Sequence, residues 1–158
     1  MNHRLRLAAG LSVMAVAAAA PAAANADSVF GGGQLSSASA NFFTFNINNG
    51  SGFVAVNDAQ TGQRYAGQVS CVRVSGNAAS FIVTIDPTLS NSSPTVVAQE
   101  FWVADNGTDP FAPTDAQRNT SLTAKQLTRL GGACPDPTAP PKALNPIALG
   151  DIAVSTTV

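Results

Sequence analysis

The sequence predicts an all-β fold, a single antiparallel β-sandwich or small barrel of about seven or eight strands. Short segments between residues 40 and 105 alternate apolar and polar side chains, which is typical of half-buried strands. Turn dipeptides such as Asn49-Gly50 and Gly76-Asn77 separate these segments. The alternation of strands and helices that indicates a parallel sheet is missing. The pattern leaves sandwich and barrel open.

The first 26 residues have the pattern of a cleavable export signal. Arg4 and Arg6 precede an apolar stretch of 14 residues that ends at Ala20, and Ala24-Asn25-Ala26 is a small–x–small cleavage site. The apolar stretch is shorter than the roughly 20 residues that span a bilayer. We therefore expect a Sec-type signal peptide over residues 1–26 and one secreted, extracellular domain over residues 27–158, with no membrane insertion after cleavage.

The sequence pattern of the first half of the domain predicts a meander of β-hairpins. Residues 43–47 alternate Phe and Ile with polar residues, the turn Asn49-Gly50 follows, and residues 53–56 form the return strand. A polar loop over residues 58–64 leads to a strand at 69–74. The apolar positions of that strand change parity near Cys71, which predicts a β-bulge.

The second half of the domain has weaker signals. After a strand at 79–85, residues 95–104 are apolar on both parities, which predicts a central or bulged strand. Residues 105–120 read as loop. Residues 121–130 fit either a strand or a helix with Ser121 as N-cap and Gly131 as its stop. A Pro-rich extended stretch follows, and a last strand is expected over residues 152–156.

Cys71 and Cys134 are the only two cysteines in the chain. In an exported protein, two cysteines most simply form one disulfide. We expect this bond to tie the late, Pro-rich segment to the middle of the sheet.

Four short motifs resemble a family of small, exported, uncharacterised bacterial all-β domains. They are the Gly-rich strand Gly31-Gly32-Gly33-Gln34, the Phe-rich second strand, the turn Val74-Ser75-Gly76-Asn77-Ala78, and Val103-Ala104-Asp105-Asn106-Gly107. The resemblance covers about half of the exported chain. It implies an exported all-β domain without assigned activity or catalytic residues.

Charge and composition exclude several function classes. After residue 26 the chain has six basic and nine acidic residues, a formal charge of −3, and no basic stripe that would bind nucleic acid. Its only histidine, His3, lies in the predicted signal. Without histidine, serine–histidine and cysteine–histidine catalysis and most zinc, copper and nickel sites are unavailable to the domain. We expect no cofactor.

The polar turn at residues 105–109 is a candidate calcium loop. Oxygens of Asp105, Asn106 and Asp109 could bind the cation, although the spacing is not that of an EF-hand. The alternative interpretation is an Asx-type turn, in which Asp and Asn accept backbone hydrogen bonds and Gly107 adopts a positive φ. We favour the turn and expect no metal.

Glu100 is the only glutamate, and Trp102 shares its parity in the predicted strand. A glycosidase-like hydrolase would pair Glu100 with Asp58 or Asp105 as acid and base, within about 10 Å of each other. The alternative is a solvated charge beside a half-buried aromatic ring, which we favour because the sequence places no second carboxylate near Glu100.

We therefore expect a secreted, non-enzymatic β-domain, monomeric, that binds an unknown protein or carbohydrate partner or serves as a surface or matrix component. Two hypotheses compete with it. One is the carboxylate-dependent hydrolase, and the other is an adhesin or assembly subunit that exchanges strands through an exposed sheet edge.

Overall fold

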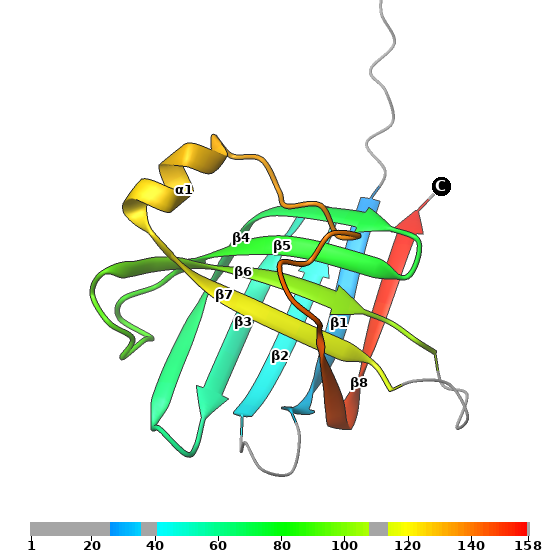
Figure 1. Ribbon diagram of the computed structural model, residues 1–158, viewed down its shortest axis with the longest axis horizontal. Coiled ribbons are helices and arrows are strands. Elements are labelled where there is room, and N and C mark those ends of the chain that lie inside the picture. Colours follow the sequence, from blue (N-terminus) through cyan, green and yellow to red (C-terminus); the bar gives the residue numbers. More distant parts are fainter. Residues whose placement is uncertain (1–25, 36–40, 108–113, 158) are drawn as a thin grey trace, which may run out of the picture.

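The protein is a closed antiparallel barrel of eight strands, in which each strand pairs with its neighbours in sequence and the last pairs with the first (Figure 1). The structure is a computed structural model that describes residues 26–35, 41–107 and 114–157. The predicted all-β fold is confirmed, and the strands form the barrel rather than the sandwich. Residues 1–25 of the predicted signal peptide lie outside the described residues. In the described ranges, no helix has the length and apolar character needed to cross a membrane.

The strands and the helix follow in chain order, and the longest connection, residues 131–144, precedes the last strand. Their bounds are β1 Ala26–Leu35, β2 Asn41–Asn48, β3 Ser51–Asp58, β4 Gln63–Ser75, β5 Ala78–Ile85, β6 Val96–Ala104, β7 Ala116–Thr123, α1 Ala124–Leu130 and β8 Asn145–Thr157.

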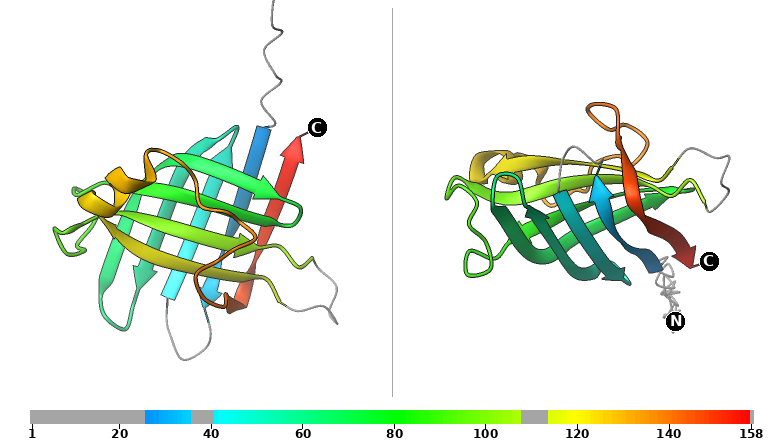
Figure 2. Two further views of the ribbon diagram at one scale, coloured as in Figure 1. Left: turned by 45° about the horizontal axis from the view of Figure 1, so that its top comes forward. Right: turned by 90° about the horizontal axis from the view of Figure 1, so that it is seen from below.

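The barrel is flattened into two walls whose strands cross (Figure 2). Strands β8, β1, β2 and β3 form one wall, β5, β6 and β7 form the other, and β4 pairs with β3 at its start and with β5 at its end. Between the walls lies an aromatic core of Phe43, Phe45, Phe81 and Phe101, with neighbouring ring centroids 4.9 to 5.4 Å apart. Stacked and edge-on rings at these distances stabilise a core beyond the area they bury.

The predicted hairpins and the bulge are confirmed. Asn49 and Gly50 have φ values of 51° and 77°, and Gly76 has φ 61°, as tight turns between antiparallel strands require. The pairing of β4 with β5 shifts register between Val69 and Cys71. Cys71 bonds Cys134 with a Cα–Cα distance of 5.8 Å, so the expected disulfide is present.

The outer side of the β5–β6–β7 wall is covered, which explains why β6 is apolar on both parities. Ala98 and Leu122 pack with Leu127 and Leu130 of α1 in a second small core. The segment between α1 and β8 crosses the same wall. There Trp102 Nε1 donates to the Asp136 carbonyl at 3.1 Å, and the disulfide also holds the segment. Ser80 Oγ donates to the Pro135 carbonyl at 2.6 Å, and Arg118 Nη1 donates to the Ala143 carbonyl at 3.0 Å.

The loop predicted over residues 105–120 is wrong in its second half, because β7 begins at Ala116. This strand pairs with β6 along its whole length. Its inward-facing residues are Gln117, Asn119 and Ser121, all polar, so the strand lacks the apolar alternation by which the other strands were recognised.

The ambiguous segment 121–130 is both strand and helix. Strand β7 continues to Thr123, and α1 begins immediately after it, so the N-cap is Thr123 and not Ser121. Thr123 Oγ1 accepts from the Gln126 amide while the Gln126 side chain accepts from the Thr123 amide, a complete capping box. Gly131, in the left-handed region with φ 59°, ends the helix as predicted.

Other segments are longer or shorter than expected. The polar loop predicted at 58–64 shrinks to residues 59–62, because β3 extends to Asp58 and β4 begins at Gln63. The last strand begins at Asn145 rather than at residue 152.

The seam between β7 and β8 is the weakest strand pairing of the barrel and is held partly by carboxylates. Only two residue pairs join these strands. Farther along β8, Asp115 Oδ2 accepts from the Ile152 amide at 2.6 Å and Asp105 Oδ2 accepts from the Val154 amide at 3.1 Å. Carboxylates thus satisfy strand amides that a neighbouring strand would otherwise pair.

Replacing Asp151, beside this seam, with Asn is expected to raise Tm at neutral pH. A side-chain hydrogen bond with Asp115, then burial, then the negative charges of Asp115 and Asp105 raise the pKa of Asp151. Folding therefore favours the protonated carboxyl, so its stabilisation is present below the unfolded pKa of about 4 and is lost as pH rises through the folded pKa.

Because asparagine resembles the protonated acid, the gain in Tm should be clear at about pH 7 and vanish near about pH 3. Thermal melts of dilute protein followed by circular dichroism check this. A variant that melts below the wild type at neutral pH contradicts it.

Candidate functional site

A polar hollow of about 180 Å³ opens at one end of the barrel, where β2 and β4 begin and β3 and β7 end. We call it the polar mouth. It is lined by Asn41, Val56, Asp58, Gln63, Tyr65, Ser92, Ser93, Val96, Gln99, Asn119 and Ser121. Apart from Val56 and Val96, every one of these side chains can form hydrogen bonds, in contrast to the aromatic core next to it.

Alternation along the strands brings the polar side chains into the barrel. Gln99 lies on the same face of β6 as Phe101, and Ser121 lies opposite Gln99 on β7. Gln99 is only 4% exposed. Burying an amide is costly unless it is hydrogen-bonded, so a polar cluster at this position needs partners.

The cluster is held by a chain of side-chain hydrogen bonds. Asn119 Nδ2 donates to the Tyr65 hydroxyl at 2.8 Å and to Gln99 Oε1 at 3.2 Å. Gln99 Nε2 donates to Ser121 Oγ at 2.9 Å. Strands β4, β6 and β7 are therefore linked through the interior as well as through the walls.

Two polar groups of the mouth keep unused hydrogen-bonding capacity. Asn41 Oδ1 is buried and has no hydrogen-bond partner among the described residues. Burial raises the pKa of Tyr65, so its hydroxyl keeps the proton. That hydroxyl accepts from Asn119, and its own proton meets no acceptor among the described residues. The mouth thus contains one acceptor and one donor that no described group uses.

Asp58 is the only charged residue among those that line the mouth. Its carboxylate accepts from the Thr61 hydroxyl at 2.8 Å and from the backbone amides of Gln60 and Thr61 at 2.9 and 3.3 Å. The hydrogen bond from the Thr61 side chain contributes most to lowering the pKa of Asp58. Asp58 therefore stabilises the turn between β3 and β4 as a stable anion.

The structure does not bring the other candidate carboxylates into the mouth. Glu100 follows the inward-facing Gln99 and lies on the outer side of β6, where burial raises its pKa. Asp105 follows the end of β6, where Oδ2 accepts from β8 as described above. Trp102 does lie on the same face as Glu100, but the segment after α1 covers it.

The candidate calcium loop has the geometry of a turn in its described part. Asp105 Oδ1 accepts from the Gly107 amide at 2.9 Å, and Gly107 has φ 79°. Asn106 donates from its side chain to the Thr114 carbonyl at 2.8 Å. Asp109 lies outside the described residues, and within the described ranges no group of three His, Cys, Asp or Glu side chains could hold a metal ion.

Sequence reasoning did not place Asn119 and Ser121 in the mouth because β7 was not recognised. One signal could have found that strand. Residues 95–104 were predicted to form a central or bulged strand, and a central strand needs a partner on each side. The chain after Asp105 had to supply the second partner.

No protein-family model matches the chain, and neither a curated protein nor a solved structure matches it. The resemblance of its turn motifs to a family of exported β-domains therefore stays a prediction. The function has to be argued from the site itself.

A double-mutant cycle tests the hydrogen-bond chain of the mouth. Tyr65→Phe and Asn119→Ala should each lower the free energy of unfolding by about 1 kcal/mol, because each breaks the same buried hydrogen bond. Their effects should not add, with a coupling of about 1 kcal/mol in urea denaturation. Thr138→Ala, on the distant segment after α1, combined with Tyr65→Phe is the additive control. Additive effects of the first pair would show that the bond contributes nothing.

Proposed function

We propose that the protein is a secreted, non-enzymatic binding domain that takes a small, neutral, polar ligand such as a sugar or polyol in the polar mouth. The observation that carries this proposal is the ring of amide and hydroxyl groups beside the aromatic core, which includes Asn41 Oδ1, a buried acceptor without a partner among the described residues. Mouths of β-barrels are a preferred place for small-molecule sites.

The chemistry of the lining favours a neutral ligand with both donors and acceptors. Side-chain amides and hydroxyls can both donate hydrogen bonds to a ligand hydroxyl and accept hydrogen bonds from it. In the mouth, Asn41 Oδ1 is an acceptor and the Tyr65 hydroxyl is a donor. The Asp58 carboxylate at the rim disfavours an anion. A hollow of about 180 Å³ holds roughly six waters at about 30 Å³ each, and a single sugar ring could take their place.

The arrangement of carboxylates gives less support to the hydrolase hypothesis. A glycosidase needs a second carboxyl that protonates the leaving group, and Asp58 is the only acid among the lining residues. Its lowered pKa keeps it ionised near neutral pH, so it is poorly suited to donate a proton.

The pairing of the strands gives less support to assembly through a sheet edge. That hypothesis requires an unpaired terminal strand, whereas β1 and β8 pair with each other. At the β7–β8 seam, the backbone amides of Ile152 and Val154 do not pair with β7, but each already donates a hydrogen bond to an aspartate carboxylate.

Titration of labelled protein with neutral sugars, followed by NMR, tests the proposal. The probes are glucose, galactose, mannose and N-acetylglucosamine. At least one should shift the side-chain amide signals of Gln99 and Asn119 and saturate, because these groups line the mouth. Asn41→Ala should weaken this binding about tenfold, the cost of a lost hydrogen bond to a buried group.

Asn46→Ala is the matched control, since Asn46 lies on the same strand but faces outward, and its binding should equal that of the wild type. Glucuronate tests the role of charge and should bind more weakly than glucose. Signals that do not move with any neutral sugar, or that move equally in both alanine variants, would overturn the proposal.

A further inference from the structure

All five large hydrophobic side chains that are exposed in the described chain lie on one side of the barrel. We call this surface the aromatic face. It carries Phe30 on β1, Phe42 on β2, Phe53 on β3, Leu149 on β8 and Leu89 in the β5–β6 loop, which are 42, 47, 36, 67 and 49% exposed. The face is the outer side of strands β8, β1, β2, β3 and the start of β4.

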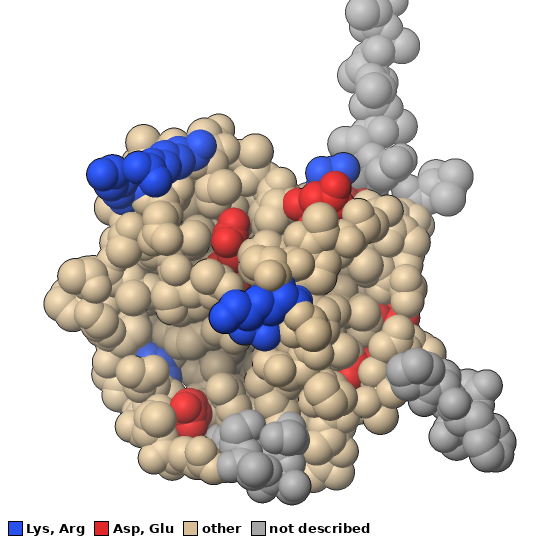
Figure 3. Space-filling model, viewed as in Figure 1, with Lys and Arg blue, Asp and Glu red and all other residues tan. Residues whose placement is uncertain are grey.

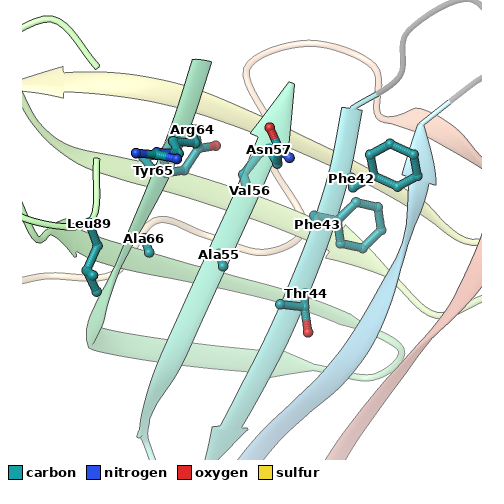
Figure 4. Close-up of a pocket in the computed structure, with 10 residues that line it drawn as sticks. All are labelled: Phe42, Phe43, Thr44, Ala55, Val56, Asn57, Arg64, Tyr65, Ala66 and Leu89. Carbon is teal, nitrogen blue, oxygen red and sulfur yellow. The ribbon is translucent and has the colours of Figure 1, made fainter. Parts of the chain in front are cut away.

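Strand register shapes the aromatic face into a trough. A row of small residues, Gly32, Thr44, Ala55 and Ala66, runs across β1 to β4. Larger side chains stand in the rows on either side of it, Phe42 on one and Phe30 with Phe53 on the other. A hollow of about 400 Å³ lies between Phe42 and Leu89 (Figure 4). A second hollow, of about 330 Å³, lies between Phe42 and Leu149.

Soluble monomers rarely expose so many large apolar side chains in one continuous patch, and such patches mark interaction surfaces. The patch lacks the basic residues that an anionic partner needs. Among the described residues of this face, Arg64 is the one basic side chain. In Figure 3, basic residues on the opposite wall also form separate small groups rather than a stripe.

The two charged residues of the aromatic face are placed symmetrically about its middle strand. In the order β8–β1–β2–β3–β4, Arg64 on β4 lies two strands to one side of β2, and Asp151 on β8 lies two strands to the other. They stand in adjacent rows, because Arg64 aligns with Phe42 and Asp151 aligns with Thr44.

Neither charge is neutralised within the chain. The Arg64 side chain makes no hydrogen bond or ion pair in the part of the chain that the structure describes. Asp151 stands beside two further acids, Asp115 and Asp105. A cation from outside the chain would relieve their repulsion.

We propose that the aromatic face binds a second copy of this chain, face to face, about a twofold axis that runs parallel to β2. Such an axis brings the Phe42 side chains of the two copies together at the centre. It also places Arg64 of each copy over the β8 edge of the other, within reach of Asp151. The two contacts are identical by symmetry, as an isologous interface requires.

The size of the face sets the strength of the dimer. Five strands about 4.8 Å apart and three rows about 7 Å apart cover roughly 500 Å² on each copy, or about 1,000 Å² in total. This lies at the lower limit for specific interfaces. The dimer should therefore be reversible and depend on concentration.

Analytical ultracentrifugation of the secreted chain over a wide concentration range tests the proposal. The wild type should shift reversibly from monomer to dimer as concentration rises. Phe42→Asp should remain monomeric, because it buries a charge at the centre of the interface. Phe42→Leu is the control for the substitution itself and should still dimerise.

Charge-reversal variants of Arg64 and Asp151 distinguish the twofold dimer from non-specific association. Arg64→Glu and Asp151→Arg should each weaken self-association about tenfold, since each places like charges opposite one another. An equimolar mixture of these two variants should dimerise as well as the wild type, because both contacts then pair opposite charges. Circular dichroism verifies that each variant is folded, and Arg64→Asp with Asp151→Lys provides a second pair.

A wild type that stays monomeric at every concentration overturns the proposal. If that monomer floats with neutral phospholipid vesicles, the aromatic face binds a lipid surface instead. Equal association of Phe42→Asp and the wild type also overturns it, as does a mixture that associates no better than its separate components. The sugar titration of the polar mouth is independent of each of these outcomes.

Discussion

The closure of the barrel between β1 and β8 is the constraint on which the rest of the structure depends. A two-walled sheet that stayed open here would expose the amides of β8 and separate the walls that enclose the aromatic core. The weak side of this closure is the β7–β8 seam, where two residue pairs form and two carboxylates bond further amides of β8. The disulfide and the segment after α1 then hold β5, β6 and β7 together from outside.

The same closure creates the candidate site. Strand β7 must lie beside β6 to complete the ring, and its inward positions carry Gln117, Asn119 and Ser121 instead of apolar residues. A strand chosen only for stability would place apolar side chains there. The hydrogen bonds from Asn119 to Tyr65 and Gln99 offset the cost of burying polar groups, and they fix the shape of the mouth.

The fold was predictable where side-chain pattern and turn chemistry agree. The alternation at Phe43, Phe45 and Ile47 and the turn at Asn49-Gly50 specify the β2–β3 hairpin by themselves, and the parity change at Cys71 predicts the bulge. The site was much less predictable. Asp58, Glu100 and Asp105 were chosen as candidates for their chemistry, and only Asp58 lines the mouth, where it stabilises a turn.

The part of the site that β7 supplies, Asn119 and Ser121, escaped prediction for a physical reason. A strand with polar residues on its inner face lacks the alternation of apolar and polar residues, so its sequence pattern predicts a loop. Pairing with β6 and packing of Leu122 against α1 order β7, and the first of these joins segments that are 12 to 27 residues apart in the chain. A polar strand inside an apolar barrel is therefore both the hardest element to recognise and the one that carries the proposed function.

Cross-strand nuclear Overhauser effects in isotopically labelled protein test this account most directly. It predicts backbone contacts between Phe101 and Asn119 and between Val29 and Val154, together with a contact from the Asn119 side-chain amide to the Tyr65 ring. Random-coil chemical shifts over residues 116–123, with no contacts to β6, would contradict it.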